Sequence, residues 1–132
     1  MRRSVLDASA VISFFEDRSG AEEVEKLVAE GLAGKAELFM SVVNWGEVYY
    51  SAWRARGQVA ARQMAAEISQ FPIQIMVADF ELTKSAAELH AKYKLPYADC
   101  FAAALSKLCK AQLVTADQDF AKVRSEIEIQ FL

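Results

Sequence analysis

Short apolar segments alternate with longer helix-forming segments along the whole chain, and this alternation constrains the fold more than any other feature. The expected strands are residues 4–6, 37–40, 73–77, 112–115 and 127–131, and the expected helices are residues 10–16, 21–32, 41–56, 59–70, 79–93, 96–110 and 117–123. Such alternation implies right-handed crossovers, and therefore an α/β fold with a mostly parallel sheet of four to five strands and helices on both faces. Parallel sheets bind ligands beside the carboxyl ends of their strands, so functional side chains are expected at that edge.

Length and composition favour one folded domain over residues 1–132. The chain has 54% hydrophobic residues, which argues against disorder, and no apolar run approaches the ~18 residues of a membrane span. The first apolar stretch ends at Asp7 and is too short for a signal peptide, so a cytoplasmic protein is expected. Cys100 and Cys109 lie roughly 13 Å apart in one expected helix, too far for a disulfide, and both are expected to be buried thiols.

Four acidic residues stand where this fold would gather functional groups. Asp7 directly follows the first expected strand, and Asp117 follows the strand that ends at Thr115. Asp99 lies in the first turn of the helix that opens after Pro96, and Glu47 lies within residues 41–56. Each has an ordinary structural explanation when taken alone. Asp7 and Asp117 suit helix caps, Asp99 suits the helix dipole, and Glu47 suits a solvated face.

Taken together, these acids predict a metal centre. Strand ends and the starts of the following helices share one edge of a parallel sheet, so Asp7, Glu47, Asp99 and Asp117 can converge there. Carboxylates in one cleft repel each other and raise each other's pKa values. Mg²⁺ or Mn²⁺ relieves that repulsion, lowers the pKa of a bound water and stabilises a charged phosphoryl transition state.

Metal-free ways of cleaving a phosphodiester bond lack the residues they need. A mechanism with two imidazoles requires two histidines, and His90 is the only one in the chain. His90 lies in an expected amphipathic helix and is expected to be a surface or half-buried residue. The chain shows neither a glycine-rich phosphate loop nor a recognisable Ser/His/Asp arrangement.

Four short blocks carry a resemblance to a known family. They are VLDASAVI at residues 5–12, SVVNWGEV at 41–48, LPYADCFAA at 95–103 and LVTADQDF at 113–120. In this order and at these spacings the chain resembles the PIN-domain ribonucleases, and in particular the VapC-type toxins of toxin–antitoxin pairs. Cys100 and Phe101 depart mildly from the pattern, because smaller or aliphatic residues are expected after the third acid.

The resemblance implies both a fold and an activity. It implies a PIN-like three-layer fold and a metal-activated water that cleaves RNA, leaving a 5′-phosphate and a 3′-hydroxyl. By the resemblance, Asp7, Glu47, Asp99 and Asp117 are catalytic and hold Mg²⁺ or Mn²⁺, with Ser9, Thr115 and Asp119 in support. It also implies neutralisation by an antitoxin protein, and a homodimer.

Several surface features fit more than one role. Trp45, Tyr49 and Trp53 form a stripe that faces away from Glu47 and suits either core packing or a protein interface. Phe14 and Phe15 are a second candidate patch. Arg54, Arg56 and Arg62 fit contacts with the RNA backbone and an ordinary solvated face equally well.

The net charge of −3 is that of an acidic protein, whereas simple nucleic-acid binders are usually basic. Once four acids are assigned to a metal cleft, the rest of the chain is slightly positive, so the net charge does not exclude an RNA substrate.

Two alternatives to a ribonuclease remain. One is a degenerate PIN domain that only binds, and the other is a phospho-receiver domain. The receiver needs adjacent acids after the first strand and a late lysine, and neither is present.

Overall fold

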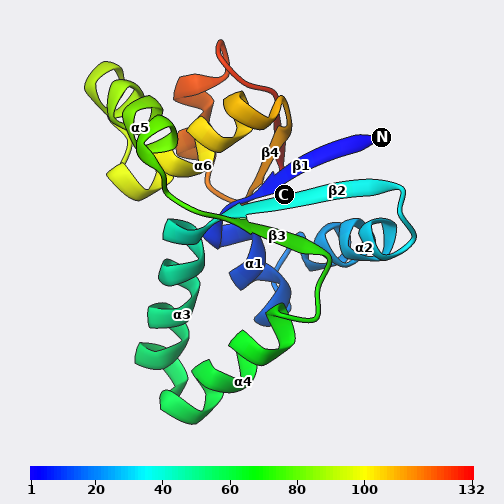
Figure 1. Ribbon diagram of the computed structural model, residues 1–132. Coiled ribbons are helices and arrows are strands. Elements are labelled where there is room, and N and C mark those ends of the chain that lie inside the picture. Colours follow the sequence, from blue (N-terminus) through cyan, green and yellow to red (C-terminus); the bar gives the residue numbers. More distant parts are fainter.

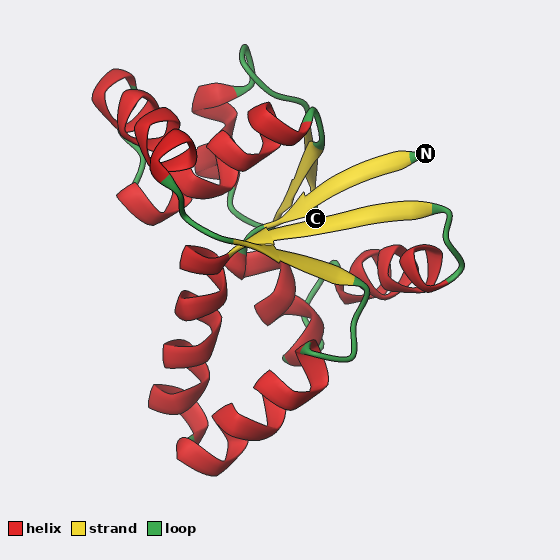
Figure 2. Cartoon of the chain, in the orientation of Figure 1, coloured by secondary structure: helices red, strands yellow, loops and turns green.

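The computed structural model describes residues 1–132 and confirms the expected α/β fold (Figures 1 and 2). The elements in chain order are β1 (Arg2–Leu6), α1 (Ala8–Phe15), α2 (Ala21–Leu32), β2 (Ala36–Ser41), α3 (Val42–Arg56), α4 (Gln58–Ile68), β3 (Ile73–Met76), α5 (Phe80–Lys92), α6 (Tyr97–Cys109), β4 (Gln112–Thr115), the 3-10 helix η1 (Gln118–Val123) and β5 (Ile129–Phe131). Several boundaries differ from expectation by one or two residues, among them the start of β1 at Arg2 and of α1 at Ala8. Residues 118–123 form a 3-10 helix, and the last strand begins at Ile129.

The sheet has five parallel strands in the order β3-β2-β1-β4-β5. The chain first builds outward from β1 through β2 to β3, then crosses over and adds β4 and β5 on the other side of β1. This reversal makes the gap between β1 and β4 the topological switch point, where ligands bind beside the strand ends. Receiver domains have the strand order 2-1-3-4-5. The receiver alternative is therefore wrong.

Two apolar layers hold the sheet between its helices. Successive residues of a strand point to opposite faces. Val5 and Leu113 thus join the layer under α5 and α6, whereas Leu6 and Val114 join the layer that contains residues of α1 to α4. Figure 1 shows these two groups of helices on opposite sides of the sheet. All four strand residues have no exposed surface, so the centre of the sheet is fully enclosed.

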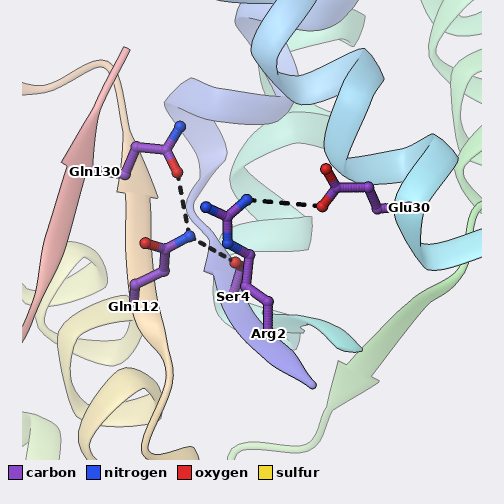
Figure 3. Close-up of polar contacts among 5 residues, drawn as sticks. All are labelled: Arg2, Ser4, Glu30, Gln112 and Gln130. Carbon is purple, nitrogen blue, oxygen red and sulfur yellow. Dashed lines mark hydrogen bonds and ion pairs between the residues drawn. The ribbon is translucent and has the colours of Figure 1, made fainter. Parts of the chain in front are cut away.

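The amino ends of the strands carry a network of neutral and paired side chains (Figure 3). Gln112 Nε2 donates to Ser4 Oγ at 3.0 Å and to Gln130 Oε1 at 3.1 Å, and so links β1, β4 and β5. Arg2 pairs with Glu30 at 3.6 Å and connects β1 to α2. These contacts close the end of the sheet opposite to the four acids.

Helices α3 and α4 form a hairpin that extends from the sheet (Figure 1). Gly57 separates them with a φ of +95°, a backbone conformation that glycine adopts without strain. None of the helices is long and apolar enough to cross a membrane.

Cys100 is fully buried as expected, and burial raises the pKa of its thiol to about 11. Cys109 is only partly buried, because it lies at the end of α6.

Candidate active site

Asp7 ends β1 and is almost completely buried, with 3% of its surface exposed. Its carboxylate caps α1 by accepting from Ala10 N at 2.9 Å, and it also accepts from Thr115 Oγ1 at 2.6 Å and from Ser9 Oγ at 2.8 Å. Burial raises the pKa of Asp7 to about 6, the hydrogen bonds oppose that rise, and the charge of Asp117 adds to it. Asp7 is therefore both a helix cap and a member of the acidic group.

Two hydroxyls join the turns that follow β1 and β4. Ser9 Oγ lies 3.1 Å from Thr115 Oγ1, and both contact the Asp7 carboxylate. Ser9 Oγ accepts from Ala116 N at 2.9 Å, and Thr115 Oγ1 accepts from Asp117 N at 3.0 Å. The hydroxyls thus orient Asp7 and fix the backbone that carries Asp117.

Asp99 lies in the first turn of α6 and faces the other acids. Burial is the main cause that raises its pKa to about 7, followed by the charges of Glu47, Asp117, Asp7 and Asp119. The charges of all the other candidate acids therefore act on the pKa of Asp99. The four acids expected to converge do lie at one edge of the sheet, beside the gap between β1 and β4.

Glu47 is positioned by a residue that sequence reasoning did not select. Asn44, one turn earlier in α3, is fully buried, and its Nδ2 donates to Glu47 Oε1 at 2.9 Å and to the carbonyl of Ala98 at 3.0 Å. Its Oδ1 is buried without a partner. Asn44 therefore ties Glu47 to the residue just before Asp99. The only signal in the sequence is an asparagine three positions before the glutamate, a spacing that puts both on one helix face.

Asp117 and Asp119 lie at the outer part of the group. Asp117 is partly buried and caps η1 by accepting from Asp119 N at 2.9 Å. Asp119 is exposed, and it acts on Asp99 only through its charge. This arrangement suits a supporting rather than a central place for Asp119.

The donor chemistry of this centre fits a hard divalent cation. Its side chains present oxygen, which Mg²⁺ and Mn²⁺ prefer. After burial, the charges of the neighbouring acids also raise the pKa of Asp99, and a cation would relieve their repulsion. As they stand, no three His, Cys, Asp or Glu side chains are placed to hold an ion. A closed ligand set therefore requires the carboxylates to turn toward one another.

The remaining candidate residues lie outside the acidic group. His90 contacts the carbonyl of Leu95 at 2.7 Å and packs against Tyr97, so it supports the segment before α6. On α3, the Trp45 and Tyr49 rings stack with centroids 5.2 Å apart, and Trp53 continues this stripe with 43% of its surface exposed.

Phe14 and Phe15 are half-buried and pack against Phe71. Both rings contact Phe71, with centroids 5.6 Å and 5.9 Å away, and both lie against the layer formed with α1 to α4. This patch is therefore part of the packing between α1 and the segment that follows α4.

Solved structures with similar folds include several toxin–antitoxin proteins. A chain in a toxin–antitoxin complex from Klebsiella pneumoniae is 20% identical with a TM-score of 0.72, over 96% of this chain and 95% of that one. VapBC2 from Rickettsia felis, bound to a promoter DNA fragment, gives 14% identity and a TM-score of 0.76 over 97% of both chains. VapC20 from Mycobacterium tuberculosis, a toxin that cleaves the sarcin–ricin loop, is 18% identical with a TM-score of 0.71, over 96% of this chain and 98% of that one. At these identities the likeness shows a shared fold.

The sequence itself carries a family match. No curated protein matches the chain in sequence. The family model of the PIN domain matches residues 4–126, which include all four motif blocks. The chain therefore belongs to the PIN domain family.

Proposed function

We propose that this protein is a metal-dependent endoribonuclease whose catalytic and metal-holding residues are Asp7, Glu47, Asp99 and Asp117. The observation that carries the proposal is the setting of Asp99, whose pKa is raised to about 7 first by burial and then by the charges of the acids around it. A fold does not retain such repulsion for stability, because the charges destabilise the native state wherever they ionise. Perturbed carboxyls at the switch point of a parallel sheet are instead typical of a functional site.

The residues of the centre have different roles. The Asp7 carboxylate accepts three kinds of hydrogen bond that favour its charged form, so it stays an acceptor despite burial. Asn44 aims Glu47, and Ser9 with Thr115 orients Asp7. Mg²⁺ or Mn²⁺ held by the four acids would supply a water of low pKa and positive charge beside the phosphate.

A panel of RNAs incubated with Mg²⁺ or Mn²⁺ tests this function. We expect cleavage that a chelator abolishes, leaving a 5′-phosphate, and we expect Asp99→Asn to lose at least 100-fold in rate, on the order of 2.7 kcal/mol or more. Glu128→Gln is the matched control, because it removes one acid at the opposite end of the sheet. We expect that control to cleave like the wild type.

Two results would overturn the proposal. Cleavage that persists in the chelator excludes the metal mechanism. Failure to cleave any RNA with either ion, by protein free of bound partners, favours the alternative of a PIN domain that only binds.

We also propose an antitoxin partner, which fits a ribonuclease acting on RNA in the cytoplasm. The structures from Klebsiella pneumoniae and Rickettsia felis are toxin–antitoxin complexes of the same fold. A hollow of about 190 Å³ between α1, α3 and α4 offers an apolar lining that includes Ile12, Phe15, Val48 and Met64. A true antitoxin must block RNA cleavage in vitro, and Met64→Glu must weaken its binding. An inhibitor that binds Met64→Glu as tightly as the wild type occupies another surface.

A homodimer is the second assembly that we propose. Val77, directly after β3, has 72% of its surface exposed, and Phe80, the first residue of α5, has 85%. Strand β3 is an edge strand of the sheet. Contiguous exposed apolar patches are typical of interfaces, and Val77 and Phe80 lie only three residues apart in the chain.

A further inference from the structure

The hairpin of α3 and α4 carries positive charge on an otherwise acidic protein. Residues 48–66 include Arg54, Arg56 and Arg62 and contain no acidic residue, whereas the whole chain has a net charge of −3. All three arginines are exposed, and the ion pairs of the structure involve other residues. Their charges are therefore available to a ligand.

One face of α3 leads from the acidic centre onto this hairpin. Glu47, Tyr50 and Arg54 follow each other at spacings of three and four residues, which puts them on one side of the helix. Tyr50 has 48% of its surface exposed, and the Arg54 guanidinium lies over its ring at 4.9 Å. Arg54 is about 10 Å along the helix axis from Glu47.

The other arginine of α3 serves as a contrast. Arg56 is two residues beyond Arg54, so it projects about 200° away around the helix. It lines the hollow between α1, α3 and α4 together with Glu16 and Glu67. Only Arg54 therefore shares the face that carries Glu47.

An exposed aromatic ring beside an unpaired guanidinium matches the chemistry of unpaired RNA. Bases stack on aromatic rings regardless of sequence, and arginine binds phosphate through a fork of N–H donors. The acidic centre repels phosphate, so the substrate needs a positive contact close by. We propose that Tyr50 and Arg54 form a subsite that binds single-stranded RNA next to the acidic centre, Tyr50 by stacking and Arg54 through a phosphate. This inference rests on the proposed ribonuclease function and names where its substrate is held.

Binding without cleavage tests the subsite. The probe is a fluorescently labelled single-stranded RNA of mixed sequence, about 16 nucleotides long, titrated with metal-free protein in a chelator and read by fluorescence anisotropy at several salt concentrations. We expect Tyr50→Leu to weaken binding by about 5- to 100-fold without changing the salt dependence. Tyr50→Phe, which keeps the ring, should restore it.

The arginine variants separate a local contact from general charge. Arg54→Gln should weaken binding and reduce the slope of log affinity against log salt by about 0.7, the value of one phosphate contact on a single strand. Arg56→Gln loses the same charge from the same helix and should bind nearly as the wild type does. A duplex of the same sequence should be insensitive to Tyr50→Leu, because its bases are already stacked.

The outcomes are distinguishable from those of the function itself. Wild-type binding by Tyr50→Leu and Arg54→Gln overturns the subsite even if the protein cleaves RNA, and so does equal weakening by Arg56→Gln. The absence of any RNA binding overturns it as well. Subsite-dependent binding by a protein that never cleaves would support the subsite and contradict the ribonuclease. If the two variants lose inhibition by an antitoxin and bind RNA normally, the face belongs to a protein partner.

Discussion

Asn44 shows how one buried side chain can set the geometry of a charged centre. Its amide nitrogen satisfies two acceptors that come from different helices, the carboxylate of Glu47 and the carbonyl of Ala98. The second contact fixes the backbone immediately before Asp99. The positions of two acids thus depend on a residue that is neutral.

We predict that Asn44→Ala impairs the centre and costs on the order of 1 kcal/mol in the free energy of unfolding, because it removes two hydrogen bonds to partly buried acceptors. RNA cleavage should fall at least 10-fold through kcat. Asn44→Asp should be worse, because it places a carboxylate against Glu47. Urea unfolding and kinetics measure both effects.

Ser69→Ala is the control for Asn44. It removes an exposed side-chain hydrogen bond to the Ala66 carbonyl and should change neither stability nor cleavage. Unchanged kinetics in both Asn44 variants would show that the centre does not depend on this amide.

The variant Thr115→Val tests the hydrogen bond that orients Asp7. The hydroxyl of Thr115 donates to Asp7 and lowers its pKa, so its removal should raise that pKa above the value of about 6. The loss should cost on the order of 1.5–3 kcal/mol, the range for a hydrogen bond to a charged group. Carbon-detected NMR titration of Asp7 in metal-free protein gives the shift. Thr83→Val in α5 is the matched control and should leave the titration of Asp7 unchanged.

The acids could be predicted from the sequence, whereas the network around them could not. Asp7 directly follows β1, Asp117 lies two residues after β4, and Asp99 lies in the first turn of α6, so their positions depend only on local pattern. The second contact of Asn44 spans 54 residues of chain. Local spacing contains no information about such a partner.

At the level of elements, α6 presents a charge at its head and an apolar surface along its length. Residues Cys100 to Ser106 are all buried, so the helix cannot shift to move Asp99 away from the other acids. The apolar packing of α6 therefore holds Asp99 near the other acids despite the repulsion between their charges. Asp99 loses its proton only when the pH approaches its raised pKa of about 7, or when a bound cation offsets the negative charges.

We predict that Asp99→Asn stabilises the metal-free protein strongly at pH 8 and clearly less at pH 5. The folded state raises the pKa of Asp99 from 3.8 to about 7, so it holds a proton that the unfolded chain has lost. That contribution to stability is complete below about pH 4 and is lost as the pH rises through 7. Thermal unfolding of both proteins in a chelator between pH 5 and 8 measures the difference.

Addition of Mg²⁺ at pH 8 provides the complementary measurement. A cation that binds the folded state raises the unfolding temperature, and the wild type should gain more than Asp99→Asn. Equal gains in both proteins would place the ion elsewhere. A lower unfolding temperature for Asp99→Asn at pH 8 without metal would contradict the repulsion inferred here.

Element boundaries followed from local signals where a cap or a glycine marks them. Ser41 and Asp79 cap α3 and α5 through side-chain oxygens, and Gly57 ends α3. The segment after Asp117 was expected to form an ordinary helix and is instead a 3-10 helix of six residues. A segment this short takes its backbone geometry from the tertiary contacts of Phe120 and Val123, which are both fully buried.

At the level of the whole molecule, the layers were predictable and the order of the strands was not. Alternating elements require a parallel sheet, but they do not state on which side of β1 each new strand is added. The order β3-β2-β1-β4-β5 is known only from the structure. The order that results brings β4 beside β1 and completes the acidic centre.

We predict that Phe80→Glu converts a homodimer into a monomer without unfolding it. Phe80 has 85% of its surface exposed, so a charge there costs nothing in the monomer and disrupts an apolar interface. Light scattering after size-exclusion chromatography measures the mass. Leu32→Glu is the control, because Leu32 is also exposed, at 69%, and lies at the end of α2. A mass unchanged by Phe80→Glu would place any dimer on another surface.

The contact between Thr115 and Asp7 has a consequence for how the protein is made. The two residues are 108 positions apart, and the strand that ends at Thr115 is the fourth of five. Chains emerge from the ribosome amino end first, so β1 pairs with β2 long before β4 exists. Until then, Asp7 lacks the Thr115 hydroxyl and Asp117 is absent. A partly synthesised or truncated chain therefore carries an incomplete acidic centre, which is completed only after nearly the whole chain has been translated.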